Sequence, residues 1–422
     1  MNRSPLKSAP KLEATLIGAG QGFKDFNQAP RFIRMYRRFP ATFTLLAPYV
    51  LLILPTAFFY GNYEIWKLIG VTSIAVAGTF LPELLWPRPK QSIPAHNADQ
   101  YGRGLFVISL FSLLVSSVIG LAAAFFGKGS VAAQIGLTSG ASGALSTLDS
   151  FTSSWQITGS ALLLAAYIGG QCTKKRLLLI LLIPVGSKLV SVVFTQITAP
   201  FFEFASFLAC LLLLLGVLRV RTFVIGLITV LIIWPTVFEI RNDLREQRNV
   251  AVDESVESFD RLRFDLQYGR AFEVTLPLNI EAPGVLLHPT PLDMVRYGII
   301  PRVLDPDRAI VSTGIVLNMA LGGSSTSSNS FGPVMNAYVL EGPVYLFLYY
   351  FTLAVCLNLI WKRGMKLTPV RLVLIALILS GPLGWFSSFP DRTIGMFQGL
   401  SAALPLFFIL FLLREQRRKK SC

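Results

Sequence analysis

Charged residues are scarce in this chain. They make up 14% of its 422 residues, whereas 53% are hydrophobic and 12% are aromatic. Soluble domains carry about 25% charged residues, so the composition argues against a water-soluble globular enzyme. Intrinsic disorder is excluded as well, because 32 Phe, 12 Tyr and 6 Trp provide more apolar surface than a disordered chain can leave in water. The composition indicates a polytopic membrane protein.

Cysteine and histidine are also few. The four cysteines lie in or beside apolar segments or at the C-terminus, and no two form a CxxC pair. The sequence therefore offers no disulfide framework and no zinc site. With only two histidines, His96 and His288, a metal–histidine centre is not expected. We predict no cofactor.

Long apolar runs occupy most of the chain. A bilayer span needs about 20 apolar residues, and ten stretches qualify: 41–59, 63–86, 104–126, 155–171, 177–196, 200–218, 222–240, 333–360, 369–388 and 394–413. The first is not expected to be a cleavable signal peptide, because a polar and basic segment precedes it. We predict an all-α bundle of about ten spans. Its parts are a basic segment 1–40, seven spans over 41–240, a large loop 241–332, three spans over 333–413 and a basic tail 414–422.

The cations set the orientation. With the N-terminus inside, 25 Lys and Arg residues fall in the cytoplasmic segments, and only Lys128 and Arg392 fall in the short outer loops. This distribution obeys the positive-inside rule. Both termini are therefore predicted to be cytoplasmic in a multi-pass plasma-membrane protein, and most of the net charge of +15 reflects topology.

The large loop 241–332 departs from this pattern. It is expected on the outer face, where a long loop can carry cations across the membrane despite the rule. It holds nine arginines, twelve acidic residues and no lysine. The planar fork of arginine suits phosphate and carboxylate, whereas lysine is a point charge. We predict that chemistry on an anionic substrate occurs here, with simple pairing between arginines and acids as the alternative.

An amphipathic helix is predicted near the start of this loop. Apolar residues recur at helical spacing over 252–270, so the helix should lie against the bundle mouth or the interface. Arg263 and Arg270 fall at the edge of the apolar stripe and are expected to face inward, unless they snorkel or form salt bridges. Arg261 and Asp265 are expected to point away.

A proline-punctuated run follows, TLPLNIEAPGVLLHPTPLDMVRYG, and is not expected to form regular helix. It contains Glu281, His288, Asp293 and Arg296. His288 is either a general base or a satisfied loop residue.

The densest charge cluster is IIPRVLDPDR, residues 299–308. Arg302, Asp305, Asp307 and Arg308 lie on a turn that proline restricts to few geometries. Two arginines held in this way could grip a diphosphate while a carboxylate serves as base. A turn that satisfies its own charges is the alternative.

Few ionisable residues lie within the predicted spans, and such residues are functional candidates by default. Lys188 is expected near the membrane middle, and Glu341 below the outer surface. Asp391 and Arg392, in a short outer loop, could reach the same pocket as Glu341. The Gly/Ser/Ala-rich stretch 136–154 is expected to be an outer loop that serves as a flexible connector.

The order of these features is similar to that in a known family. The bundle, the large late outer loop, an R-x-R-x-D helix, a "tP…yG…iPR" run and a Ser/Thr-rich stretch resemble the O-antigen/exopolysaccharide repeat-unit polymerases (Wzy-type), relatives of the O-antigen ligases. The matching positions are Arg263, Pro291, Tyr297, Gly298, Pro301 and Arg302, with Asp305, Pro306 and Asp307 where the family often has "lWPdKP".

Two positions depart from the family pattern. Arg308 stands near the usual lysine. Asn336 occupies the glutamate position of "E-x-Y-x-N-F-G", although Tyr338 and the glycine, Gly342, are retained. Glu341 is the acidic residue that could compensate.

The resemblance implies a metal-independent glycosyltransferase of the GT-C type on the outer face of the bacterial plasma membrane. Donor and acceptor would be glycans on undecaprenyl diphosphate. A flippase and a chain-length regulator would be partners, and nucleic acid would not. The growing chain would pass from its lipid carrier onto the next lipid-linked repeat unit, in O-antigen, capsule or exopolysaccharide synthesis.

That chemistry needs positive charge at the leaving diphosphate and a base at the acceptor hydroxyl. Arginines of the loop suit the first role, and a carboxylate or histidine suits the second. The diphosphate candidates are Arg263 and Arg302, then Arg308 and Arg270. The base candidates are Asp305, Asp265 and His288, and further candidates are Arg261, Arg296, Tyr338 and Glu341.

Three alternatives stay open. An O-antigen ligase is expected to have a histidine in a late outer loop before a Gly-rich stretch, as His288 stands before Gly322 and Gly323. A transporter of lipid-linked oligosaccharide predicts similar halves and charges spread through the spans, whereas here the charge is concentrated in one loop. The third is a structural partner in an envelope complex.

Overall fold

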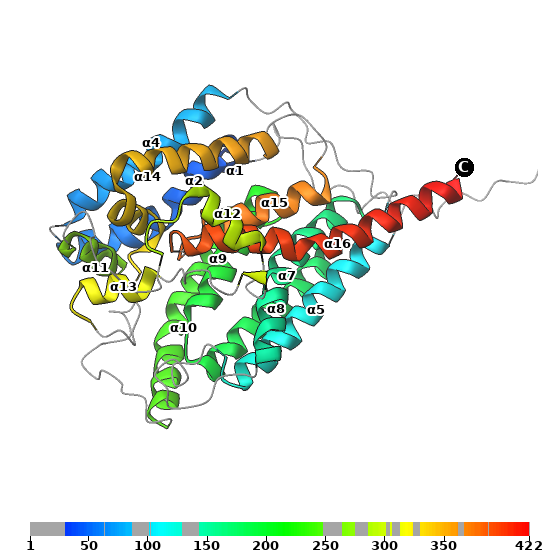
Figure 1. Ribbon diagram of the computed structural model, residues 1–422, viewed down its shortest axis with the longest axis horizontal. Coiled ribbons are helices and arrows are strands. Elements are labelled where there is room, and N and C mark those ends of the chain that lie inside the picture. The colour runs from blue at the N-terminus through cyan, green and yellow to red at the C-terminus, as the bar shows by residue number, and fades with distance from the viewer. Residues whose placement is uncertain are drawn as a thin grey trace, which may run out of the picture.

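The computed structural model describes residues 30–62, 64–86, 101, 103–128, 143–247, 264–274, 286–300, 304–305, 313–323, 330–361, 367–386 and 388–421. Within these ranges every regular element is a helix (Figure 1). The helices are α1 (Arg31–Arg38), α2 (Pro40–Pro48), the π-helix η3 (Tyr49–Ile53), α3 (Leu54–Phe59), α4 (Ile65–Leu85), α5 (Gly104–Phe125), α7 (Gly143–Ile168), α8 (Lys174–Thr195), α9 (Ala199–Leu214), α10 (Val220–Glu246), α11 (Phe264–Gly269), the 3-10 helix η6 (Arg270–Glu273), α12 (Pro291–Ile299), α13 (Thr313–Ala320), α14 (Gly332–Trp361), α15 (Pro369–Ser380) and α16 (Asp391–Ser421).

Seven of the described helical segments are long and apolar enough to cross a membrane. They are Pro40–Phe59 (α2, η3 and α3), α4, α5, α8, α10, α14 and Asp391–Gln416 of α16. The other three predicted spans also fall on helices, namely α7 and the shorter apolar helices α9 and α15. The protein is thus an all-α membrane protein with seven candidate spans, and the predicted total of about ten is not confirmed.

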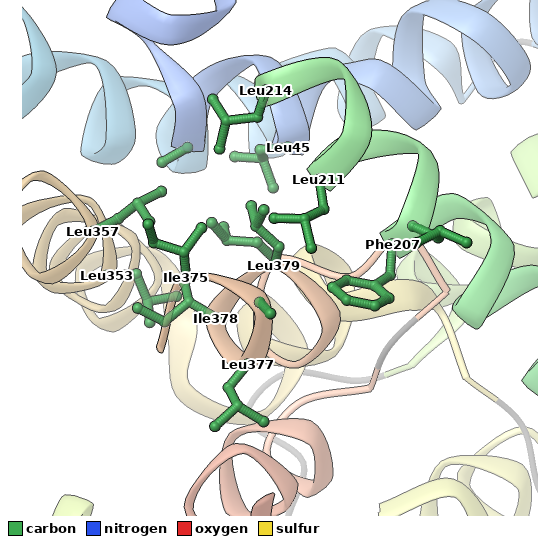
Figure 2. Packing of buried hydrophobic residues seen from close by; sticks show 14 of the residues in the cluster. Leu45, Phe207, Leu211, Leu214, Leu353, Leu357, Ile375, Leu377, Ile378 and Leu379 are labelled. Atoms are coloured by element: carbon green, nitrogen blue, oxygen red, sulfur yellow. The ribbon is translucent and has the colours of Figure 1, made fainter. Parts of the chain in front are cut away.

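The short helix α15 forms the centre of the bundle. It contacts α7, α9, α14 and α16, and its residues from Ile375 to Leu379 are almost fully buried. Leu211 of α9 and Leu353 and Leu357 of α14 belong to the same cluster (Figure 2). Lipid tails are as apolar as leucine, so close packing holds such helices together. Because protein surrounds α15, it need not be as long as a lipid-facing span.

Two buried charges satisfy helix ends inside the bundle. Nε and Nη2 of Arg37 donate to the carbonyl oxygens of Leu214 (3.0 Å) and Leu215 (2.9 Å) at the end of α9. Glu83 accepts the backbone N–H of Ala41 at 2.8 Å at the start of α2. Burial lowers the pKa of Arg37 to about 10, so it stays charged at neutral pH. A cation at a helix C-terminus and an anion at an N-terminus complement the helix dipole.

Helix α12 corrects one prediction. Residues 291–299, at the end of the proline-punctuated run, form a regular helix. The Thr290 hydroxyl accepts the N–H of Asp293 (3.2 Å), and the Asp293 carboxylate accepts the N–H of Thr290 (3.0 Å). Pro291 occupies the first helical position, where a missing N–H costs nothing. The prolines of this segment therefore start a helix.

Helix α7 corrects another. It begins at Gly143, so residues 143–154 are helical, and the predicted loop is wrong there. The hydroxyls of Ser150 and Thr152 donate to backbone carbonyls four residues earlier, which satisfies these polar side chains within the helix. Of the predicted amphipathic helix, only α11 and the start of η6 fall in the described part of the chain.

Candidate functional site

Helix α14 consists of two helices joined at a kink. Gly342 there has φ 80° and ψ 179°, a conformation that favours glycine, and Pro343 has no N–H to continue the hydrogen-bond ladder. Glu341 directly precedes the kink, and its side chain is 17% exposed. The kink therefore leaves an ionisable carboxylate accessible at a break in a membrane helix.

Glu341 pairs with His288. Nδ1 of His288 lies 3.2 Å from Oε1 of Glu341, and the imidazole is 49% exposed. His288 stands just before the N-terminus of α12, so two segments far apart in sequence supply the pair. Both residues were sequence candidates, but their contact was not predicted. A carboxylate and an imidazole in contact can orient one another and exchange a proton with a substrate, which makes them a candidate acid–base unit.

A second ion pair joins α12 to the segment that follows it. Nη2 of Arg296, on α12, lies 2.9 Å from Oδ2 and 3.0 Å from Oδ1 of Asp305. The Asp305 side chain is largely buried, whereas half of Arg296 is exposed. The alternative prediction, that loop arginines simply pair with acidic residues, therefore holds for Arg296 and Asp305. Asp305 is thus occupied by Arg296, whereas Glu341 contacts an imidazole.

Asp265 and Arg270 do not lie as predicted. Asp265 is fully buried and accepts a hydrogen bond from Nδ2 of Asn62 at 3.1 Å, which ties α11 to the turn before α4. Arg270 is exposed, and its Nε lies 3.6 Å from Oε2 of Glu273. The predicted faces are therefore reversed. The described helix is short and packs on α3 and α4, so its tertiary contacts, and not the periodicity over 252–270, set its faces.

Asn336 occupies the position where the family resemblance expects a glutamate, and its role is structural. Asn336 is fully buried; its Oδ1 accepts the N–H of Phe331, and its Nδ2 donates to the hydroxyl of Ser330. It thereby secures the start of α14. Tyr338 is half-buried against the core of the bundle. The candidates Arg261, Arg263, Arg302 and Arg308 lie outside the described residues and stay predictions.

An apolar cavity of about 720 Å³ opens between α8, α9 and α10. Its walls are mostly aliphatic and aromatic, and include Leu182, Phe202, Leu208, Leu227, Leu231 and Trp234. Arg241, near the end of α10, and Gln267 and Tyr268 of α11 also line it. The cavity thus extends from the apolar helices to α11, an element of the segment predicted to be the large loop.

At the end of the cavity beside α11, hydrogen bonds fix the side chains that line it. Tyr268 donates to the carbonyl of Trp385 at 3.3 Å, and burial raises the pKa of this phenol, which keeps it neutral. Gln267 donates to the carbonyl of Ser330 at 2.6 Å. Arg241 is 8% exposed as a residue, and its guanidinium lies over the ring of Phe238, 4.3 Å from the ring centroid. This end presents a buried cation beside an apolar space.

The first turn of α16 joins three parts of the bundle. Asp391 accepts a hydrogen bond from Ser388 at 3.2 Å. Arg392 forms an ion pair with Glu203 of α9. Thr393 shares a hydrogen bond of 2.5 Å with Tyr349 of α14. Asp391 and Arg392, predicted to reach the pocket, instead have partners that secure neighbouring elements.

Sequence reasoning missed Glu203 and Arg241. Glu203 interrupts an apolar run, the signal that singled out Lys188 and Glu341, and could have been found in the same way. Arg241 carries no such signal, because most spans end in a charge. In the described ranges, no group of three His, Cys, Asp or Glu side chains is placed to hold a metal ion.

Comparison of the chain with protein-family models, curated proteins and solved structures finds no match. The fold and its apolar helices define a polytopic membrane protein. Its function is inferred from its residues and their geometry.

Close packing of α12 on α16 holds His288 and Arg296 in place, and it depends on Gly298. A Cβ at this position would lie 2.2 Å from Cβ of Phe397 and 2.9 Å from the carbonyl of Ile394. We expect Gly298→Ala to displace α12 and to lower the free energy of unfolding by about 1–3 kcal/mol. Thermal unfolding of the detergent-purified protein measures this.

The matched control is Gly395→Ala on the same α16, because a Cβ there meets no atom within 4 Å. Its unfolding midpoint should not fall below that of the wild type, because alanine favours a helix more than glycine does. Equal midpoints for both variants would contradict the packing argument.

Proposed function

We propose that the protein is a Wzy-type polymerase, a metal-independent GT-C-type glycosyltransferase of the bacterial plasma membrane with both termini in the cytoplasm. It would join undecaprenyl-diphosphate-linked oligosaccharide repeat units into O-antigen, capsule or exopolysaccharide on the outer face. The observation that carries this proposal is the apolar cavity that meets the outer-loop element α11 beside the buried Arg241.

A lipid-linked glycan has an apolar tail, a diphosphate and a sugar, and each needs different surroundings. The aromatic and aliphatic walls between α9 and α10 suit a branched isoprenoid chain. Arg241 supplies positive charge where such a tail would end, and guanidinium binds phosphate oxygens in bidentate fashion. This order of apolar wall, cation and loop matches the order of parts in the substrate.

The reaction joins an acceptor hydroxyl to the anomeric carbon of the donor chain. The hydroxyl oxygen forms the new glycosidic bond, the bond from the anomeric carbon to the diphosphate oxygen breaks, and undecaprenyl diphosphate leaves. Glu341 takes the hydroxyl proton, and His288 orients the carboxylate. Arg241 and Arg296, with the predicted Arg263, Arg302 and Arg308, stabilise the charge on the departing diphosphate.

A ligase that transfers the finished glycan to another acceptor is the second candidate. The contact between His288 and Glu341 favours it to the same degree, since a late-loop histidine is what that alternative predicts. The two functions differ in the acceptor. A polymerase extends a lipid-linked repeat unit, and a ligase leaves long lipid-linked polymer as its substrate.

Loss of the Glu341 carboxylate tests the assignment of the base. General-base catalysis contributes about 10²–10⁴-fold to a rate, so we expect Glu341→Gln to slow polymerisation of purified lipid-linked repeat units by that factor. The control is Glu415→Gln at the far end of α16, which should polymerise at the wild-type rate. If Glu341→Gln retains full activity while both variants reach equal levels in the membrane, Glu341 is not the base.

Filling the cavity tests the lipid site. Gly226 lines the cavity, and a Cβ there meets no atom within 4 Å, so Gly226→Phe should fold and project into the space. We expect it to weaken binding of undecaprenyl diphosphate at least about tenfold, or 1.4 kcal/mol, as measured on the purified protein in nanodiscs.

Gly70→Phe on α4 is the control, because its surroundings are equally open and it lies outside the cavity. It should bind undecaprenyl diphosphate like the wild type. Wild-type affinity in Gly226→Phe would remove the observation on which the proposal rests.

A further inference from the structure

Helix α1 is attached to the bundle through one face. Its buried residues are Ile33, Tyr36 and Arg37. The Tyr36 hydroxyl donates to the carbonyl of Cys210 at 3.3 Å, and Arg37 donates to two carbonyls at the end of α9. The indole N–H of Trp361 donates to the carbonyl of Arg37 at 3.0 Å. These contacts fix α1 against α9 and the end of α14.

The opposite face of α1 is basic and partly apolar. At 100° per residue, Arg31, Met35 and Arg38 lie opposite the buried residues, and Phe32 and Arg34 lie at the edges of that face. Arg31, Phe32 and Met35 are exposed, and the other two arginines are partly exposed. This outward face of α1 therefore combines three cations with two apolar side chains.

The protein supplies no acidic partner to these cations among the described residues. None of the three arginines forms an ion pair there. The sequence has no Asp or Glu over 26–63. Glu83, which lies at the start of α2, is buried, and its carboxylate accepts two backbone N–H groups. It is thus committed to α2 and does not compensate the outward face of α1.

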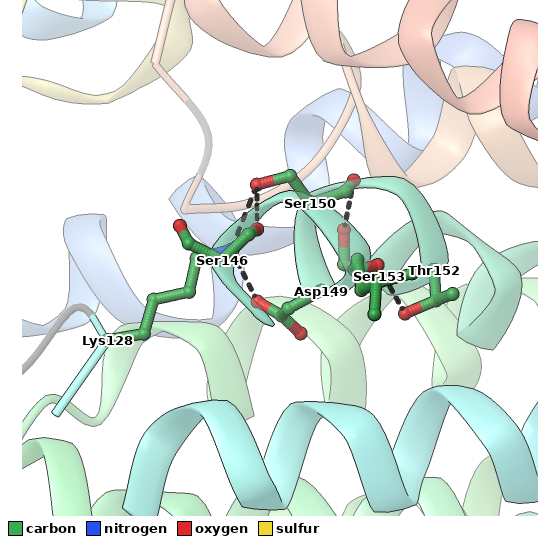
Figure 3. A network of polar contacts seen from close by, with 7 residues as sticks. Lys128, Ser146, Asp149, Ser150, Thr152 and Ser153 are labelled. Atoms are coloured by element: carbon green, nitrogen blue, oxygen red, sulfur yellow. Dashed lines mark hydrogen bonds and ion pairs between the residues drawn. The ribbon is translucent and has the colours of Figure 1, made fainter. Parts of the chain in front are cut away.

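Lys128, which follows α5, shows how this bundle compensates a cation. Its Nζ lies 2.7 Å from Oδ2 of Asp149, and it donates to the carbonyl of Ser146 at 2.7 Å and to the hydroxyl of Ser150 at 2.9 Å (Figure 3). An ammonium has three donors, and all three are used. The arginines on the outward face of α1 have no comparable set of partners in the described part of the chain, so an anion from outside the protein can bind them.

The outward face lies beside a membrane span. The candidate span Pro40–Phe59 begins two residues after the end of α1. Phe32 packs edge to face against Phe43 of that span, with ring centroids 5.7 Å apart. Residues just outside a span lie at the depth of the lipid headgroups, where anionic lipids attract clustered arginines and apolar side chains of an amphipathic helix reach the acyl boundary. Charge and position together therefore favour a phospholipid over a soluble anion.

We propose that the outward face of α1 binds anionic phospholipid, with its three arginines at the phosphate groups and Met35 and Phe32 against the acyl chains. None of these five residues lines the apolar cavity or belongs to the pair of His288 and Glu341. The proposal therefore does not rest on the proposed function.

Native mass spectrometry of the full-length protein, with phosphatidylglycerol or phosphatidylcholine added, tests this site. We expect Arg31→Gln/Arg34→Gln/Arg38→Gln to bind phosphatidylglycerol at least tenfold more weakly than the wild type, because the charges that face the phosphates are lost. Arg31→Lys/Arg34→Lys/Arg38→Lys should retain binding, because the charges are kept. Phosphatidylcholine, which has no net charge, should bind the wild type and both variants equally weakly.

The matched control is Arg103→Gln/Arg414→Gln/Lys419→Gln. It removes three exposed cations from the start of α5 and from α16, so the net charge changes by the same amount. This variant should bind phosphatidylglycerol like the wild type.

A loss confined to the glutamine variant of α1 supports the site. An equal loss in the control would show a general response to net charge and overturn the proposal, and so would wild-type affinity in the glutamine variant of α1. Phosphatidylcholine bound by the wild type as tightly as phosphatidylglycerol would overturn it as well, because charge would then contribute nothing. None of these results depends on Glu341 or Gly226, so failure here and failure of the proposed function are distinguishable.

A footprint on the wild type covers the case in which the glutamine variant does not fold. Phenylglyoxal labelling of the full-length protein, read by peptide mass spectrometry, should show Arg31, Arg34 and Arg38 protected by phosphatidylglycerol, and Arg414 labelled as before. Equal labelling of the α1 arginines with and without the lipid overturns the proposal. Equal protection by glycerol 3-phosphate at the same concentration overturns the assignment to a lipid, because the acyl chains would then contribute nothing.

Discussion

Polar groups inside a bilayer must find their partners within the protein, and this constraint shapes the whole bundle. Arg37 donates to a carbonyl at the end of α9, and Glu83 accepts a backbone N–H at the start of α2. Arg392 forms an ion pair with Glu203, which joins α16 to α9. These contacts hold short and long helices around the buried α15. Charges with a structural partner of this kind need no further explanation.

Two other places suit different parts of one amphipathic substrate. Arg241 stands at the loop end of an apolar cavity, and Glu341 meets His288 at the kink of α14. A transferase that handles two lipid-linked molecules needs apolar surface for their tails, cations for their phosphates and a base for the attacking hydroxyl. The acid–base pair and the apolar cavity are separate features of one scaffold.

Composition and apolar runs were enough to predict an all-α membrane bundle, because hydropathy responds directly to the bilayer. The predictions failed for two different reasons. At Pro291 a local signal was overlooked, because Thr290 and Asp293 form a capping box that starts a helix. At Asp265 a tertiary contact decided the result, because Asn62 donates a hydrogen bond to it. Single residues such as His288 and Glu341 could be named from sequence, but their contact joins positions 53 residues apart. No spacing rule predicts such a contact.

The proposed function is the polymerisation of lipid-linked repeat units. The most direct test is mass spectrometry of lipid-linked glycans from a strain that lacks this protein, beside the same strain with the gene restored. Single repeat units on undecaprenyl diphosphate should accumulate, and polymer should disappear, only in the strain without the protein. Long polymer stranded on the carrier would contradict a polymerase and identify a ligase, and an unchanged profile would contradict both.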